Sequence, residues 1–291
     1  VAAVLLSSRA LAPLAQIANL FGRLNAARTA YKKIDQLMSA VSTEQADSPG
    51  TEVTELGDLE WKRLSFTYPE SSQPSLIEVN AVIKAGERVA IMGRNGSGKT
   101  TLIKLTAGLY QPTQGGLTFN RMPTNQIDND TLRQKMAVVL QDFQLFSGTL
   151  RDNILMDREW IDDDALREAL ECSGVQRFLA TIPGGIQAVL ADRGQSLSTG
   201  QRQAIALARA LSARPEVLLL DESTAALDLN SEQDFVKRID DCMYTTLILV
   251  THRLPMLELV DRIIILAEGR IAIDGPRDDV LAKLKAGKKN E

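Results

Sequence analysis

Cysteine and histidine are scarce in this chain of 291 residues, and basic residues are fewer than acidic ones. The two cysteines, Cys172 and Cys242, belong to no CxxC motif and no Cys/His cluster, so the sequence indicates neither a zinc site nor a disulfide framework. We expect both to be buried small apolar residues in a reducing compartment. The net charge of -4 argues against nucleic acid as the main partner, because phosphate backbones require a basic face.

Complete membrane and export signals are also missing. Residues 1–8 are apolar and are followed by Arg9, whereas a membrane span needs about 20 apolar residues. A signal peptide would carry its positive charge before the apolar run and not after it. The chain begins with Val1, so we interpret residues 1–41 as the end of the last hydrophobic helix of a longer polypeptide, with its cytosolic extension.

The first part of the chain is predicted to be helical. Apolar residues recur at spacings of three and four over residues 1–40, and Pro13 is a possible kink. A soluble amphipathic helix packed on the rest of the chain is the alternative to a membrane helix. Residues 42–52 have the composition of turns, and we place a linker at 42–56.

From residue 57 onward, short strands alternate with helices. Continuous apolar runs such as residues 217–220 and 246–250 suit parallel strands that are buried on both faces. The further predicted elements are strands at 59–68, 77–84, 88–92 and 136–140, a helix at 99–109, a charge-rich helical stretch at about 142–214 and a hairpin at 263–273.

A glycine-rich loop carries the strongest chemical signal. It follows a predicted strand, opens a predicted helix and fits GxxxxGK[ST], which predicts backbone amides that converge on phosphate oxygens. Lys99 is expected to reach the β- and γ-phosphates, and the Thr100 hydroxyl is expected to hold magnesium. The predicted nucleotide-binding residues here are Gly93, Arg94, Asn95, Gly96, Ser97, Gly98, Lys99, Thr100 and Thr101.

Two carboxylates and the only histidine follow buried strands. Asp221 and Glu222 come directly after residues 217–220, and His252 follows residues 246–250. Ligands bind at the carboxyl ends of strands in open α/β sheets. We predict that Asp221 holds magnesium, that Glu222 acts as general base or positions the attacking water, and that His252 contacts the γ-phosphate.

Three further positions have both a functional and a structural interpretation. Gln141 follows a strand and has an amide oxygen that suits the magnesium shell. Tyr68 is either an adenine-stacking ring or a core aromatic. Ser198 is placed to cap the helix after it, and together with Thr199, Gly200 and Gln201 it offers a second phosphate-binding surface.

In their order along the chain, these motifs resemble the nucleotide-binding domain of ABC (ATP-binding cassette) transporters over about residues 57–285. The most specific element is the signature segment, residues 197–201. The resemblance implies a P-loop NTPase (RecA-like) α/β core with an antiparallel β subdomain and an α-helical subdomain at about 142–214, within a cassette at 57–291 that a long N-terminal helix precedes. It also implies a magnesium-dependent ATPase that binds ATP, and two copies packed head to tail so that each signature segment meets the γ-phosphate on the other copy.

Two residues depart from the family pattern. Thr199 stands where the family usually has glycine, and Ala225, in the segment 225–228 after the acids, stands where serine is more usual. A side chain at 199 is expected to crowd the approach to phosphate. The change at 225 puts one hydrogen bond of the dimer interface in question.

The N-terminal segment and residues 192–194 are similar to fused exporters, and residues 9–16 resemble bacterial type I secretion ATPases. The expected partners are a second copy, the membrane-spanning domain of the same polypeptide and, for type I secretion, a periplasmic adaptor and an outer-membrane channel. The expected location is the cytoplasmic face of the inner membrane. A lipid or drug exporter ATPase of the same class and a cytosolic non-transport ABC ATPase are the alternatives.

Overall fold

The computed structural model describes residues 16–17, 19–36, 38, 50–190, 194–223, 229–242 and 245–287. It divides the chain into two compact units, Val1–Pro49 and Gly50–Glu291. In the first unit, residues 19–36 are helical, and the large apolar side chains that the structure describes there, such as Phe21 and Tyr31, are exposed. Among the described helices, none is both long and apolar enough to span a bilayer. Pro13 and residues 42–49 of the predicted linker lie outside the described residues.

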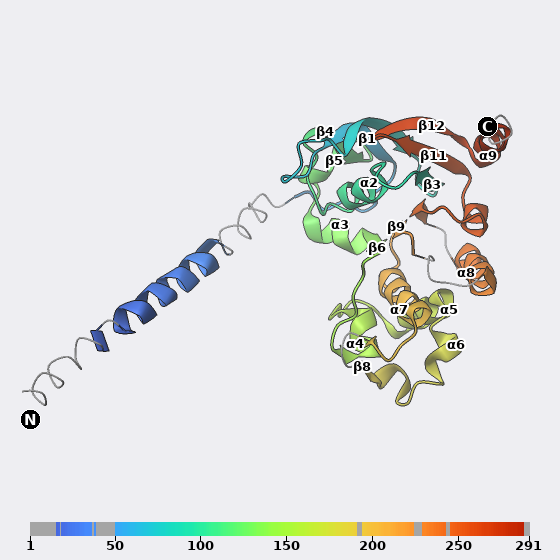
Figure 1. Ribbon diagram of the computed structural model, residues 1–291. Coiled ribbons are helices and arrows are strands. Elements are labelled where there is room, and N and C mark those ends of the chain that lie inside the picture. The colour runs from blue at the N-terminus through green and yellow to red at the C-terminus, as the bar shows by residue number, and fades with distance from the viewer. Residues whose placement is uncertain are drawn as a thin grey trace, which may run out of the picture. The chain divides into compact units, whose positions relative to one another are not determined.

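The second unit is built on a six-stranded sheet (Figure 1). All neighbouring strands in it are parallel except the pair formed with the edge strand β12. Strands β9 and β10 are buried at every position, as continuous apolar runs predict. In spatial order the strands are β12 (Arg270–Pro276), β11 (Arg262–Ala267), β3 (Arg88–Gly93), β10 (Thr246–Val250), β9 (Val217–Asp221) and β6 (Met136–Val139).

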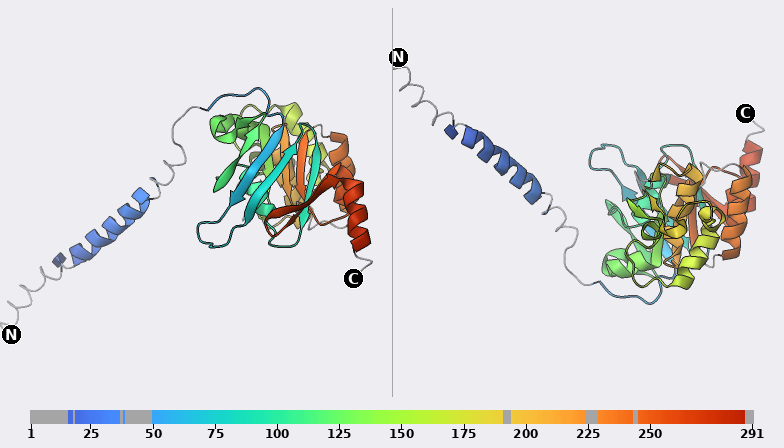
Figure 2. Two further views of the ribbon diagram at one scale, coloured as in Figure 1. Left: turned by 90° about the horizontal axis from the view of Figure 1, so that it is seen from above. Right: turned by 90° about the horizontal axis from the view of Figure 1, so that it is seen from below.

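A second, antiparallel sheet shares a hydrophobic core with one face of the first (Figure 2, left). Helix α2 (Lys99–Thr106) contributes Leu102 and Ile103 to this core. The indole of Trp61 donates to the Thr106 hydroxyl at 3.1 Å, which ties the sheet to the helix that follows the glycine loop. In spatial order the strands are β2 (Leu76–Ile83), β1 (Leu59–Phe66), β4 (Gln114–Phe119) and β5 (Met122–Pro123).

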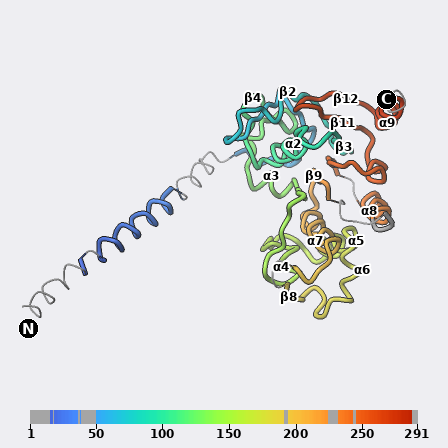
Figure 3. The backbone as a smooth tube through the Cα atoms, viewed as in Figure 1, coloured from blue at the N-terminus to red at the C-terminus, as the bar shows by residue number. Residues whose placement is uncertain are grey.

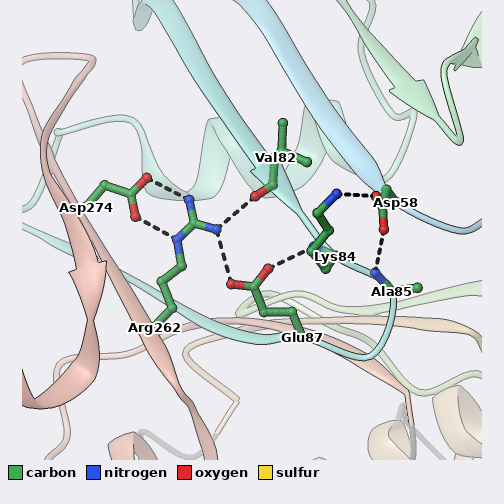
Figure 4. Close-up of polar contacts among 7 residues, drawn as sticks. All are labelled: Asp58, Val82, Lys84, Ala85, Glu87, Arg262 and Asp274. Carbon is green, nitrogen blue, oxygen red and sulfur yellow. Dashed lines mark hydrogen bonds and ion pairs between the residues drawn. The ribbon is translucent and has the colours of Figure 1, made fainter.

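Arg262 connects the two sheets at their shared end (Figure 4). It forms a bidentate pair with Asp274 and also donates to the carbonyl of Val82 and to the Glu87 carboxylate. The hydrogen bonds to Asp274 and Glu87 raise the pKa of Arg262 above its ordinary value. This cluster keeps β11 in place beside the antiparallel sheet, and β11 in turn pairs with the strand that leads into the glycine loop.

Residues 50–56, the second half of the predicted linker, are bound to the cassette. Thr51 donates to the carbonyl of Gln126 at 2.7 Å. Leu56 is buried, and its amide donates to the Glu216 carboxylate at 2.7 Å. In the structure, the folded unit therefore begins at Gly50.

The other face of the central sheet is covered by helices. Its core joins the sheet to residues of α7, α8, the 3-10 helix η4 and α9. The bounds are α8 (Leu229–Cys242), η4 (Pro255–Leu259) and α9 (Arg277–Gly287). On the side of β6, the 3-10 helix η1 (Thr124–Gln126) and α3 (Asn129–Lys135) precede that strand.

Between β6 and β9 the chain enters and leaves a helical lobe, as the tube in Figure 3 shows. The lobe has its own hydrophobic core. The predicted helical stretch 142–214 also contains a small two-stranded antiparallel sheet that the sequence did not indicate. The elements are β7 (Gly148–Thr149), α4 (Leu150–Leu155), α5 (Asp163–Ser173), α6 (Gln176–Leu179), η2 (Gly185–Gln187), β8 (Val189–Leu190) and α7 (Thr199–Leu211).

The expectation of two independent, reduced cysteines is wrong. Cys172 near the end of α5 and Cys242 at the end of α8 form a disulfide, with Cα atoms 5.9 Å apart. The two residues are separated by 70 positions. Spacing along the sequence does not reveal such a pair, because the packing of α5 against α8 brings the residues together.

Candidate nucleotide site

The glycine loop, residues 93–100, lies between the buried strand β3 and α2. A Cβ atom on Gly93 would lie 2.2 Å from the Leu266 carbonyl, and one on Gly98, at φ 100°, would lie 2.6 Å from the Ser75 carbonyl. These positions therefore require glycine. Lys99 donates to the carbonyls of Gly93 and Arg94, both at 3.0 Å, so its ammonium group is held over the loop.

Asp221 has the properties of a cation ligand. It ends β9 and is fully buried, and neither carboxylate oxygen has a hydrogen-bond partner among the described residues. Burial raises the pKa of Asp221, and the neighbouring Glu222 adds to the shift, while the nearby Thr100 hydroxyl and Lys99 oppose it. A buried carboxylate beside a threonine hydroxyl fits a magnesium ion, which prefers oxygen ligands and would supply the missing positive charge. The described residues contain no cluster of three His, Cys, Asp or Glu side chains, so phosphate oxygens or water would complete the shell.

Glu222 and His252 face each other across the ends of neighbouring strands. The Glu222 amide donates to the carbonyl of Val250, and His252 Nδ1 lies 3.6 Å from Glu222 Oε1. The Glu222 side chain is 19% exposed and that of His252 is 69% exposed, so both can reach a ligand. Glu222 has a φ of 47°, an uncommon value for a residue with a side chain, as expected where the fold fixes a functional group.

A buried ion pair that the sequence did not indicate holds the loop around His252. Arg253 lies 3.1 Å from the Glu232 carboxylate, which is fully buried in the first turn of α8. The Arg253 amide also donates to the Thr251 hydroxyl. The sequence gives no signal of this contact, because Glu232 and Arg253 belong to different elements of the chain.

Tyr68 belongs to an aromatic cluster beside the first turn of α2, and its stacking on adenine stays a prediction. Its half-buried ring packs edge-on against Phe66 and Tyr110, and its hydroxyl lies 3.2 Å from that of Thr101. Thr101 is itself buried in α2. The contact places the ring beside the first turn after the glycine loop, with part of its surface exposed.

The loop after β6, which carries the exposed Gln141, is tied to the signature helix α7 by Arg209. Arg209 donates to the carbonyls of Asn153 and Gln144 and lies 5.3 Å over the ring of Phe146. Burial lowers the pKa of Arg209, and nearby Arg158 lowers it further. Sequence analysis missed Arg209, because an arginine on a helix normally indicates a solvated face.

The signature segment ends in a complete capping box. Ser198 Oγ accepts from the Gln201 amide at 3.2 Å, and Gln201 Oε1 accepts from the Ser198 amide at 2.9 Å. Ser198 and Thr199 are exposed, and Thr199 Oγ1 accepts from Arg202. The predicted cap is therefore present at the start of α7. Residues 191–193 and 224–228 lie outside the described residues. They include most of the segment 192–194 and all of the segment 225–228.

The signature segment, at the start of α7, lies away from the glycine loop, which leads into α2 (Figure 1). It lines a pocket of about 480 Å³ together with Arg177, Phe235 and Arg238. Figure 1 shows α7 with α4 and α5 in the helical lobe, whereas α2 lies beside the central sheet. The predicted site residues thus form two groups within one chain, with the glycine loop, acids, His252 and Tyr68 in the core and Ser198, Thr199, Gly200 and Gln201 on the lobe.

The glycine loop, the acid at the end of β9 and the sheet order define a P-loop ATPase. Residues 76–225 match the family model described as ABC transporter. The chain is 33% identical to the probable multidrug resistance ABC transporter ATP-binding/permease protein YheI of Bacillus subtilis, over 93% of this chain and 46% of YheI. It is 32% identical to the cyclolysin secretion/processing ATP-binding protein CyaB of Bordetella pertussis, over 96% of this chain and 39% of CyaB.

Among solved structures, a bacterial Atm1-family ABC exporter with ATP bound matches with a TM-score of 0.75 and 30% identity, over 81% of this chain and 42% of that chain. The chain belongs to the ABC transporter family and is an ATP-binding, ATPase domain of it. It spans less than half the length of these relatives.

Proposed function

We propose that two copies of this domain bind ATP between them, head to tail, and that hydrolysis drives export by a membrane-spanning domain of the same polypeptide. One observation carries the proposal: the exposed Ser198 and the N-terminus of α7, the kind of helix end that binds anions, lie on a lobe away from the glycine loop of the same chain. A second copy supplies the phosphate that this surface lacks. ATP then joins the two copies, and hydrolysis releases them.

The residues of each half have distinct tasks. Lys99 and the loop amides bind the β- and γ-phosphates, and Thr100, Asp221 and Gln141 hold magnesium. The magnesium ion supplies positive charge to the phosphate oxygens. Glu222 orients and deprotonates the attacking water, and His252 holds Glu222 and the γ-phosphate in line. Ser198 of the other copy donates to the γ-phosphate and excludes water from that side.

An exposed apolar surface on the helical lobe supports coupling to a membrane domain. Val189 is 76% exposed on the strand that pairs with β7, and Phe146 and Met156 nearby in the chain are exposed as well. This surface lies next to the loop that carries Gln141, so a domain bound there is linked through Arg209 to α7. We place the domain on the cytoplasmic face of the inner membrane.

For the exported substrate we propose a protein or peptide, as in type I secretion with a periplasmic adaptor and an outer-membrane channel. The similarity to CyaB, whose description includes secretion, supports this choice. YheI, described as a multidrug resistance transporter, is as similar, so drug or lipid export is the alternative. Stimulation of the ATPase of the full-length protein by an unfolded polypeptide, but not by a lipid or drug, would favour the first.

Complementation tests whether sites are shared between copies. Glu222→Gln and Ser198→Arg are each expected to be inactive. In a mixed dimer, one site carries both changes and the other pairs an intact Glu222 with an intact Ser198. We expect ATPase activity to reappear on mixing, well above that of either variant alone.

Two controls make this result interpretable. Ser196→Arg places the same charge on an exposed position two residues earlier and should remain active. Circular dichroism checks that Ser198→Arg keeps α7 folded without its cap. Mixed dimers that form but stay inactive would call for a second measurement, the specific activity of wild type at increasing protein concentration. A constant specific activity would contradict the shared site. A rising one would indicate strict cooperativity between the two sites.

A further inference from the structure

The disulfide adds a covalent link between two hydrophobic cores to which helix α7 also contributes side chains. Cys172 lies near the end of α5, which contributes Leu170 to the core of the helical lobe. Cys242 ends α8, which contributes Ile239 to the core under the central sheet. The bond is therefore a covalent connection between the lobe and the ATP-binding core.

The ring that the disulfide closes contains at least one residue from each group of the proposed active site. The 70-position separation includes Ser198 at the start of α7 and Glu222 after β9. The orientation of the lobe decides where Ser198 points. A link between α5 and α8 thus restricts the placement of Ser198 relative to the core that carries Glu222.

The ion pair and the hydrogen bond that join α5 or α6 to α8 are weaker than this bond. Arg177 pairs with Asp234 at 2.6 Å, with both side chains at least half exposed, and Arg238 Nε donates to the Cys172 carbonyl at 3.4 Å. Exposed ion pairs of this kind contribute little to stability. Once the disulfide is open, α5 is held to α8 by these contacts and by side-chain packing.

The disulfide is reachable from solvent. A pocket of about 290 Å³ is lined by both cysteines together with Glu168, Arg214 and Pro215. Cys172 is 4% exposed, whereas Cys242 is half-buried, so Cys242 is the more accessible residue of the pair.

We propose that Cys172 and Cys242 form a reversible thiol/disulfide modification site that takes a dithiol reductant, and that the disulfide slows ATP turnover by holding the helical lobe in one orientation. The inference rests on the proposed function, because that function places the domain in the reducing cytoplasm. Disulfides that form there are typically transient and act in sensing or catalysis rather than in structure.

The reduction is balanced by thiol–disulfide exchange. A thiolate of the dithiol attacks the Cys242 sulfur, and Cys172 leaves as a thiolate that takes up a proton. The second thiol of the reductant then attacks the reductant sulfur that is bonded to Cys242, and Cys242 is released as a thiolate. The protein gains two electrons and two protons, and the dithiol becomes a disulfide.

The test compares oxidised wild type with wild type that has been reduced by dithiothreitol and alkylated with N-ethylmaleimide. Mass spectrometry counts the alkylated cysteines. We expect reduction to raise the ATPase rate at saturating ATP by roughly fivefold or more, a usual size for coupling between sites. Cys172→Ser, Cys242→Ser and the double variant should all have the higher rate and show no response to reductant.

A second measurement does not depend on catalysis. Hydrogen exchange in α5 and α8 should be slower in the oxidised chain and faster in the reduced chain. Equal ATPase rates and equal exchange in the two forms, or a disulfide that native protein keeps in dithiothreitol, would overturn the proposal. A chain that hydrolyses no ATP in either form would refute the proposed function. The exchange measurement would still show whether the disulfide restrains α5 and α8.

Discussion

The core and the helical lobe of this domain are built by different kinds of contact. In the core, the reacting groups come from short motifs whose local geometry sets them: Lys99 binds carbonyls five and six positions away, and Asp221 is placed by its own strand. In the lobe, the links are between residues far apart in the sequence: Arg209 joins α7 to the loop after β6, and the disulfide joins α5 to α8. Local structure thus positions the reacting groups of the core, whereas contacts between residues far apart in the sequence position the lobe.

The largest effect is expected from Glu222→Gln in the core. The substitution keeps the shape and removes the base, so turnover should fall by about 10²–10⁴-fold while ATP binding survives. Glu258→Gln, on an exposed position, is the matched control and should be silent. Turnover close to wild type in Glu222→Gln would remove Glu222 from its assigned role.

Asp221→Asn separates stability from function in the core. Because the folded pKa of Asp221 is raised by burial, the folded chain holds the proton more tightly than the unfolded chain. Without nucleotide, the free energy of unfolding should therefore decrease as pH rises from the ordinary Asp value through the raised one. The Asn variant should lose this dependence, gain about 1–3 kcal/mol at neutral pH and lose magnesium-dependent turnover. Denaturant unfolding across pH measures the first two, and a variant less stable than wild type would contradict the argument.

Arg209→Ala tests the long-range support of the lobe. The change removes charge-assisted hydrogen bonds to two backbone carbonyls and should cost about 1.5–3 kcal/mol in unfolding free energy. Arg167→Ala breaks only an exposed pair with Asp164 and should cost less than about 0.5 kcal/mol. Equal losses in the two variants would mean that Arg209 is not a support.

Tyr68→Ala should weaken nucleotide binding by roughly 1–3 kcal/mol if the ring stacks on adenine. Tyr68→Phe should bind nearly as well as wild type, although it loses the contact with Thr101. Tyr110→Ala removes a ring from the same aromatic cluster and controls for packing. Calorimetric titration would show whether Phe is as weak as Ala, which would assign the effect to the hydroxyl.

The smallest effect is expected on the lobe surface, from Thr199→Gly. The side chain is exposed and contacts only Arg202 among the hydrogen bonds of the described residues. If it crowds the approach of phosphate, its removal should keep turnover or raise it within about twofold. A large loss of turnover with binding intact would show that the threonine makes a contact of its own.

The same contrast explains what the sequence predicted. The P-loop fold class and the buried strands were confirmed, because apolar runs and glycine spacing are local signals. The roles of the site residues remain predictions. The disulfide, the Arg253–Glu232 pair and the Arg209 contacts were missed, because each joins residues that only the tertiary fold brings together. Helix α2 ends at Thr106 rather than at 109, since Gly108 at φ 71° stops it.

The anchoring of residues 50–56 also has a mechanical side. Tension applied to the chain before Gly50 passes first to the hydrogen bond of Thr51 with Gln126, and next to that of Leu56 with Glu216. Glu216 directly precedes β9, the strand that ends in Asp221. A force on the start of the cassette therefore acts at one end of β9, and Asp221 lies at the other end of that strand. Only the five residues of β9 separate the point where the force acts from the acid.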